Sequence, residues 1–289
     1  GPDDDLPWAD VRKALEEIVQ GAAKVTEESY SRGLGRAVAG AVIFSLPLLM
    51  TMEMWDLGQT MGRFRLALFI ALTAVVVFGL SRFAGFRDDT TLADDMLDAL
   101  AALMVGFVVS AALLWIMGLI GPQTGLRELA GTVGVQAAPA SMGAALANKQ
   151  LSEGSRGQQK EDRAGYPGQL FLMGAGALYF AFNVAPTEEM LVIGFKMTPW
   201  HSLALVGVSL LTLHALVFSV GFAGQATPGG PFADFLNFTL AGYGIALIVS
   251  LYVLWTFGRI DGDFSATIRS VAVVGFPAAI GAALARLVV

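Results

Sequence analysis

Acidic residues stand beside apolar runs at two places in this sequence, where carboxylates could bind a cation or carry a proton. Glu53 lies in TMEM (51–54), and Glu188 and Glu189 lie in TEEM (187–190), directly after NVAP. A charged carboxylate at the middle of a bilayer costs about 2.5–3.5 kcal/mol on insertion scales. We therefore expect these acids to lie at the membrane edge, to face water, or to pair with a cation or with each other.

Polar neighbours could complete such an ion or substrate site. Thr51, Thr187 and Asn183 flank the acids in the sequence. His214, in LLTLHALVF, could relay protons, and the alternative is a histidine held by a structural hydrogen bond. The chain has no cysteine and two histidines, which leaves little for a transition-metal site, and no cofactor motif is present.

The composition is that of a membrane protein. Hydrophobic residues make up 55% of the 289, charged residues 15%, and the net charge of −6 gives no reason to expect nucleic acid. Because about 20 apolar residues of helix cross a bilayer, the sequence predicts an all-α, polytopic transmembrane bundle. Its eight predicted segments are 37–57, 64–83, 96–120, 126–148, 168–186, 200–222, 234–258 and 265–288.

Five short motifs recur in the same order, 136–140 residues apart. The pairs are AGAVIF (39–44) with AGALYF (175–180), TMEM with TEEM, FAG (83–85) with FAG (222–224), SAALLWIMGLI (110–120) with SLYVLWTFGRI (250–260), and PASMGAALA (139–147) with PAAIGAALA (277–285). This order predicts a tandem duplication into two four-helix halves. The predicted domains are a cytoplasmic amphipathic arm (1–32), a first repeat (33–149), a cytoplasmic linker (150–166) and a second repeat (167–289).

The distribution of basic residues favours eight crossings. With eight, 12 of the 18 lysines and arginines fall on the side of the N-terminus, whereas a seven-crossing arrangement divides them 10 to 8. Because cytoplasmic flanks carry the excess of basic residues, both termini are expected in the cytoplasm. The fourth segment of each half carries small residues at i, i+4 and i+8, which let helices approach closely, so we expect these two segments at the centre. They are Pro139, Gly143 and Ala147, and Pro277, Gly281 and Ala285.

Two interpretations of the acids stay open at this point. In the first, Pro186 belongs to the first turn of a new helix, where acids favour the positive end of the helix dipole, and Glu188 and Glu189 lie at the outer interface. In the second, the helix breaks at NVAP, and Asn183, Thr187, Glu189 and Glu53 line a polar vestibule between the halves, as in transporters with broken helices.

Four stretches resemble a bacterial integral-membrane family classed as a domain of unknown function. They are FSLPLLMTMEMW (44–55), SRFAGFRD (81–88), AFNVAPTEEM (181–190) and KMTPWH (196–201), and the similarity runs over residues 33 to 289. The resemblance implies a protein of the bacterial inner membrane and no particular mechanism.

Three functional hypotheses follow from the residues. The first is a transporter or channel for a small cation or proton, with Glu53 and Glu189 as charged ligands. The second is a non-transporting sensor or assembly protein that contacts a cytoplasmic partner through its arm and linker. The third, an enzyme acting on lipid within the membrane, has Glu188, Glu189 and His214 to offer. The oligomeric state stays open, a homo-oligomer included.

Overall fold

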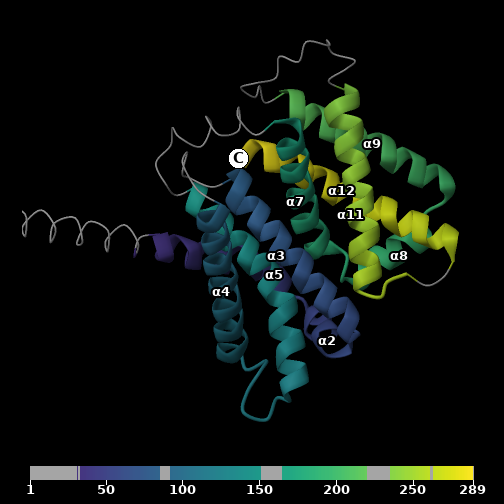
Figure 1. Ribbon diagram of the computed structural model, residues 1–289. Helices are drawn as coiled ribbons and strands as arrows, with labels where there is room; N and C mark the ends of the chain where they lie inside the picture. The colour runs from purple at the N-terminus through teal and green to yellow at the C-terminus, as the bar shows by residue number, and fades with distance from the viewer. Residues whose placement is uncertain are drawn as a thin grey trace, which may run out of the picture.

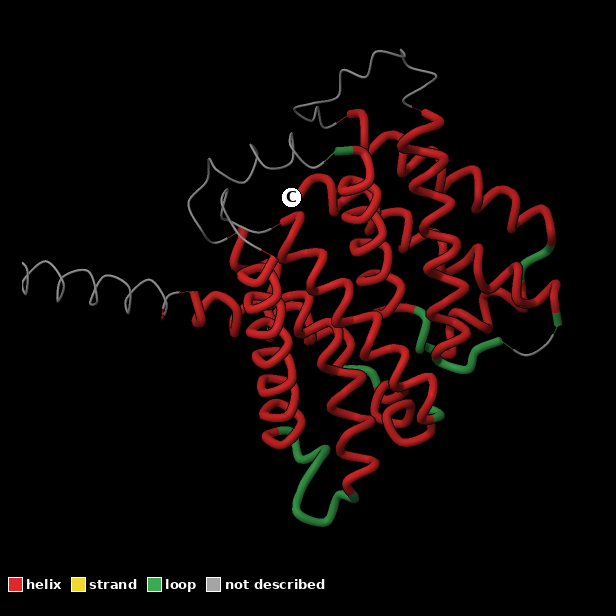
Figure 2. Tube along the Cα trace, in the orientation of Figure 1, coloured by secondary structure: helices red, strands yellow, loops and turns green. Residues whose placement is uncertain are grey.

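A computed structural model describes residues 31, 33–84, 92–150, 165–219, 235–260 and 263–288, and this part of the chain is helical throughout, with short turns and no strand. The predicted all-α class is therefore confirmed for these residues (Figure 2). The predicted arm and the predicted linker lie almost entirely outside the described residues.

The helices follow one another with short connections where the chain is described (Figure 1). A first helix, Gly33–Leu49, precedes the labelled elements. The labelled elements are α2 (Met52–Thr60), α3 (Arg63–Ala84), α4 (Leu92–Ile116), α5 (Leu126–Gln150), α7 (Tyr166–Val184), α8 (Glu188–Lys196), α9 (Pro199–Ser219), the π-helix η1 (Phe235–Leu240), α11 (Ala241–Thr256) and α12 (Phe264–Val288).

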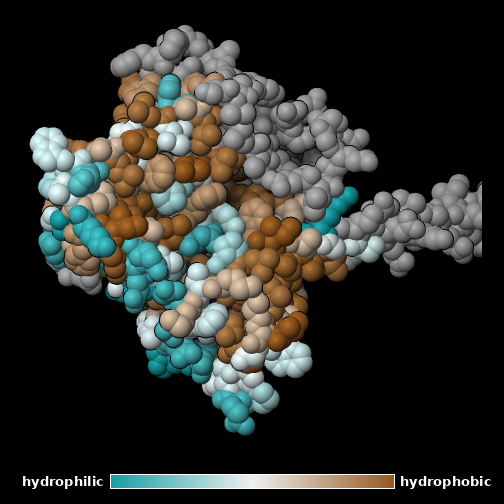
Figure 3. Space-filling view, turned by 180° about the vertical axis from the view of Figure 1, so that it is seen from behind, coloured by the Kyte–Doolittle hydropathy of each residue, from teal (hydrophilic) through white to brown (hydrophobic). Residues whose placement is uncertain are grey.

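Five of these helices are long and apolar enough to cross a membrane, and the number rises to seven if each of two bent pairs counts as one span. The five are α3, α4, α9, η1 with α11, and α12. Large apolar side chains on their outer faces are exposed, among them Met104, Leu211 and Ile248. Figure 3 shows hydrophobic residues over much of the described surface, as expected where lipid is the solvent.

The segment predicted over 37–57 is two helices and not one. The first helix ends at Leu49, and α2 leaves it at an angle of 90°. The corresponding break further along the chain, between α7 and α8, bends the path by 92°. NVAP marked that second break in the sequence through Pro186, whereas the proline nearest the first break, Pro47, lies inside the first helix, four residues before Thr51.

The fourth predicted segments are the central helices, as expected. α5 packs against α2, α3 and α4, and α12 packs against α7, α8, α9 and α11. Every residue from 131 to 144 of α5 is buried. α5 does not pass the apolarity test for a span, and its burial gives the physical reason. A helix that is enclosed by protein does not need an apolar outer surface.

Two close helix crossings hold these central helices in place. A methyl group on Gly143 of α5 would overlap the backbone carbonyl of Gly40 in the first helix. In the same way, a methyl group on Gly281 of α12 would overlap the carbonyl of Gly176 in α7. The small residues of PASMGAALA and of PAAIGAALA each let another helix approach closely, as predicted. The partners are the glycines of AGAVIF and AGALYF, two further motifs from the recurring set.

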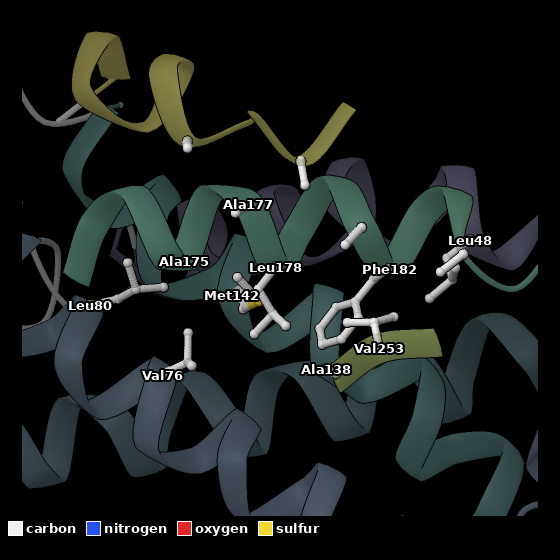
Figure 4. Close-up of a cluster of buried hydrophobic side chains, with 14 of the residues drawn as sticks. Leu48, Val76, Leu80, Ala138, Met142, Ala175, Ala177, Leu178, Phe182 and Val253 are labelled. Carbon is white, nitrogen blue, oxygen red and sulfur yellow. The ribbon is translucent and has the colours of Figure 1, made fainter. Parts of the chain in front are cut away.

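Apolar side chains fill the space where residues 33–149 meet residues 167–289. Side chains of α3, α5, α7 and α11 gather there, among them Leu80, Met142, Ala175 and Val253 (Figure 4). Aromatic rings join the two parts at several levels. Phe69 of α3 lies 5.0 Å from Phe182 of α7 and 5.8 Å from Phe257, measured between ring centroids. At another level Phe44 lies 4.8 Å from Tyr179. α5 and α12 face each other across an apolar cavity, whose wall both helices help to form.

Adding one methyl group at either crossing should destabilise the protein. Gly143→Ala and Gly281→Ala each place a Cβ against a backbone that cannot move aside, and overpacking of this kind costs about 1–3 kcal/mol. Thermal or SDS-induced unfolding in detergent measures the effect. Gly207→Ala in α9 is the matched control, because a Cβ there meets nothing within 4 Å. Stability equal to the control for both crossing variants would contradict the close approach.

Candidate functional site

The predicted site residues lie at the two sharp breaks, and a threonine stands at each. The Thr51 hydroxyl donates to the Leu48 carbonyl at 2.8 Å, and the Thr187 hydroxyl donates to the Val184 carbonyl at 2.9 Å. Each of these carbonyls stands at the end of the preceding helix, where four carbonyls lack a partner within the helix, and it also accepts the threonine's own backbone N–H at 3.2 Å. Neither side chain caps the helix that follows. The threonines close the first helix at each break.

The acids follow directly, in the first turn of a nine-residue helix at each break. Glu53 is partly exposed in α2, and Glu188 and Glu189 are exposed in α8. Negative charge at this position favours the positive end of the helix dipole. The first interpretation of the sequence predicted this local placement. Its detail about Pro186 was wrong, because that residue lies in the turn, two positions before α8 begins.

Asn183 lies in the last turn of α7, just ahead of the break. Its side-chain amide donates to the Tyr179 carbonyl at 2.7 Å. Its Oδ1 is buried and has no hydrogen-bond partner among the described residues. An unsatisfied buried acceptor of this kind calls for an explanation, and a bound cation or a water molecule would supply the missing partner.

Two arginines hold α8 at its two ends. An Nη of Arg259, in the turn after α11, donates to the carbonyl of Pro186, just before α8. An Nη of Arg269, in α12, donates to the carbonyl of Met197, just after α8, at 3.4 Å. Hydrogen bonds from a charged donor are worth about 1.5–3 kcal/mol. The orientation of α8 is therefore tied to the α11–α12 region.

The first break is held by different side chains. The Trp55 indole donates to the Leu49 carbonyl at 3.0 Å, and the Gln59 amide donates to Glu128 of α5 at 2.7 Å. α2 thus packs beside α5, while α8 packs beside α12. Figure 1 shows α2 and α8 at separate positions. Glu53 and Glu189 therefore belong to two distinct local environments.

His214 is engaged in a structural contact. Its Nδ1 lies 2.9 Å from the Thr239 hydroxyl in η1, and its ring packs 4.6 Å from that of Phe218. It lies 15 residues into α9, which places it about 22 Å along the helix from the end that adjoins α8. The alternative of a hydrogen-bonded histidine agrees with this geometry.

The described residues hold no group of three histidine or acidic side chains that could bind a metal ion. The apolar cavity between α5 and α12 has none of the predicted site residues in its wall. What the arrangement offers chemically is accessible carboxylates at both breaks, each on a short helix that follows a threonine-closed helix end.

Sequence reasoning missed the role of Arg259, although a signal was present. SAALLWIMGLI and SLYVLWTFGRI share their tryptophan and glycine, and the second motif carries Arg259 where the first carries Leu119. A charge that appears in one copy of an apolar motif indicates a contact peculiar to that copy. Arg269 gave no comparable signal.

Comparison with known proteins adds one finding. The chain matches the family described as "Putative integral membrane protein (DUF2391)" over residues 33–289. Neither a curated protein nor a solved structure matches it. The match agrees with the resemblance carried by the sequence motifs.

Removing the guanidinium of Arg259 should loosen α8. Arg259→Met loses a charge-assisted hydrogen bond, so the backbone amides of α8 should exchange with deuterium about tenfold faster or more. Hydrogen–deuterium exchange of the protein in detergent measures this. Arg63→Met, at an exposed position at the start of α3, is the control. Equal exchange of α8 in both variants would show that the arginine does not hold the helix.

Proposed function

The chain belongs to this family of integral membrane proteins, and we propose that it is a carrier for a small cation or a proton that uses Glu53 and Glu189. In this proposal Glu188, Asn183, Thr51 and Thr187 support the two acids. The protein sits in a bacterial inner membrane with both termini in the cytoplasm, in line with the excess of basic residues on that side.

The proposal includes two related halves, residues 33–149 and 167–289, with four crossings each. The order of elements supports this division. In each half a helix ends in a bend of about 90°, a nine-residue helix follows, and a 25-residue helix with an internal proline comes last. Gly118 and Gly258, 140 residues apart, both have a positive φ after the third crossing. α5 counts as a crossing because it is enclosed by the helices around it.

The observation that carries the function is the likeness of the two breaks. Each combines a threonine hydroxyl bonded to the preceding helix with an acid in the first turn of the next. Accessible carboxylates at the membrane edge raise the local concentration of cations, which is the first requirement of a cation carrier.

A carrier suits the packing between the halves better than an open channel. Phe69, Phe182 and Phe257 are buried there together with leucine and alanine side chains. An ion that passes between the halves must wait for them to move apart, as in alternating access. The tie from Arg259 to Pro186 couples α8 to the α11–α12 region, so that a shift of those helices would move Glu189.

A second candidate function is supported by the same apolar packing between the halves. A membrane-embedded sensor or assembly protein needs no polar path, and its bundle is expected to be filled with apolar side chains. Such a protein would contact a cytoplasmic partner through the charged residues of 1–32 and 150–166. His214 has no assigned part in either candidate.

Neutralising both acids should abolish transport. Reconstituted Glu53→Gln/Glu189→Gln protein should show cation or proton flux at least about tenfold below that of the parent protein. Flux into proteoliposomes under an imposed cation or pH gradient measures this, with fluorescent indicators for protons, Na⁺, K⁺ and Mg²⁺ in turn.

Asp56→Asn is the matched control for the transport test. Asp56 is an exposed acid of α2, three residues after Glu53, and it has no acidic counterpart in the other half. Its variant should retain the parent flux. Parent flux in the double variant would contradict the proposed role of the acids. If the parent protein carries none of these ions, the second candidate becomes the better explanation.

A further inference from the structure

The two glycine crossings leave a cavity between them, and its wall is almost pure hydrocarbon. Its volume is about 280 Å³. Its wall is formed by Phe44, Leu80, Met142, Leu146, Leu172, Ala175, Gly176, Tyr179, Phe180, Gly281, Leu284 and Ala285. Tyr179 alone among these carries a polar side-chain group, and its hydroxyl already donates to the Phe44 carbonyl at 3.3 Å.

Water is a poor occupant for this cavity. A buried water molecule needs two to four polar partners, and apolar cavities remain dry even when they are large enough. An empty cavity is also unfavourable, because the atoms of its wall lose dispersion contacts on one side. An engineered apolar cavity of about 150 Å³ takes up benzene, and this one is nearly twice as large. An apolar ligand therefore fits its chemistry.

The shape of the cavity favours a chain over a compact molecule. On α7 its wall runs from Leu172 to Phe180, which is about 12 Å along the helix axis. A cavity of about 280 Å³ that extends along a wall of this length suits an elongated hydrocarbon chain.

The surroundings supply such a chain. The wall comes from the first helix and from α3, α5, α7 and α12, which belong to an integral membrane protein. α3 and α12 are long and apolar enough to cross the bilayer. The cavity is not fully enclosed, and at membrane depth the solvent around it is lipid acyl chain. We propose that the cavity is a binding site for one acyl chain of a bilayer phospholipid.

Residues of both parts of the molecule would hold the chain. Phe44 and Leu146 contribute from residues 33–149, and Phe180 and Leu284 contribute from residues 167–289. The acyl chain fills the gap across which α5 and α12 face each other, so it joins the two parts beside the ring contact of Phe44 with Tyr179. This inference does not depend on the proposed transport function.

Photolabelling in proteoliposomes tests the site. The probe is a phosphatidylcholine with a diazirine on one acyl chain, and mass spectrometry maps the labelled residues after irradiation of the full-length protein. Labels are expected on Leu172–Phe180 and on Gly281–Ala285, as well as on lipid-facing Met104 of α4, which is 69% exposed.

Filling the cavity should remove the first two sets of labels and spare the third. Ala175→Phe places a ring in the cavity beside Leu80 (Figure 4), and labelling of α7 and α12 should fall about tenfold or more while labelling of Met104 stays the same. Val108→Phe, on the lipid-facing side of α4, is the matched control and should keep every label. Leu284→Phe fills the cavity from α12, and it replaces Ala175→Phe in the labelling test if that variant does not give a monodisperse protein.

Three results would overturn the proposal. The first is cavity labelling in the filled variants equal to that of the parent. The second is labelling of Met104 without any on α7 or α12 in the parent protein, which would mean that no lipid chain enters. The third is strong labelling of the cavity residues by a small aromatic diazirine probe and weak labelling of them by the phospholipid probe. This result would assign the cavity to a compact apolar ligand.

Discussion

The contact of glycine backbone with glycine backbone, made at two places, is the constraint on which the rest of this structure depends. Between membrane helices there is little hydrophobic driving force, because lipid is as apolar as the side chains. Association has to come from close packing, and Gly40 against Gly143 and Gly176 against Gly281 provide it. These contacts fix α5 and α12 as the central helices. The placement of α2 beside α5 and of α8 beside α12 follows from that arrangement, and with it the position of the acids.

The proposed carrier and the inferred lipid site both arise from the space that these crossings define. Each crossing draws one pair of helices together and leaves the two pairs facing each other across a cavity. Aromatic rings close the contact between the pairs at one level, around Phe69, and at another level, around Phe83 and Phe171. A hydrocarbon chain between these levels would make the packing complete. In a carrier built in this way, the two halves would move past each other with a flexible lipid chain between them, and not with tightly packed side chains alone.

Much of the fold could be predicted from composition and from motif spacing. Charge-free runs located the long helices, and the i, i+4, i+8 pattern of small residues identified the central ones. The break after Leu49 was missed because the chain stays apolar through Met50 and Met52, and the nearby Pro47 lies inside the first helix and not in the break. The break depends on hydrogen bonds from Thr51 and Trp55, which hydropathy does not report. Comparison with NVAPTEEM could have revealed this break, since Thr51 and Thr187 occupy the same position in the recurring motifs TMEM and TEEM.

The candidate site was harder to predict, because its supporting contacts are long in sequence and specific to one break. Arg259 reaches Pro186 across 73 positions, and Gln59 reaches Glu128 across 69. Solid-state NMR of the protein in lipid bilayers, with ¹³C at the glycine carbons, tests the central claim most directly. We predict through-space cross-peaks between Gly40 and Gly143 and between Gly176 and Gly281, because their backbones touch. The absence of either cross-peak, while the one between Gly174 and Gly176 of the same helix is present, would contradict the account.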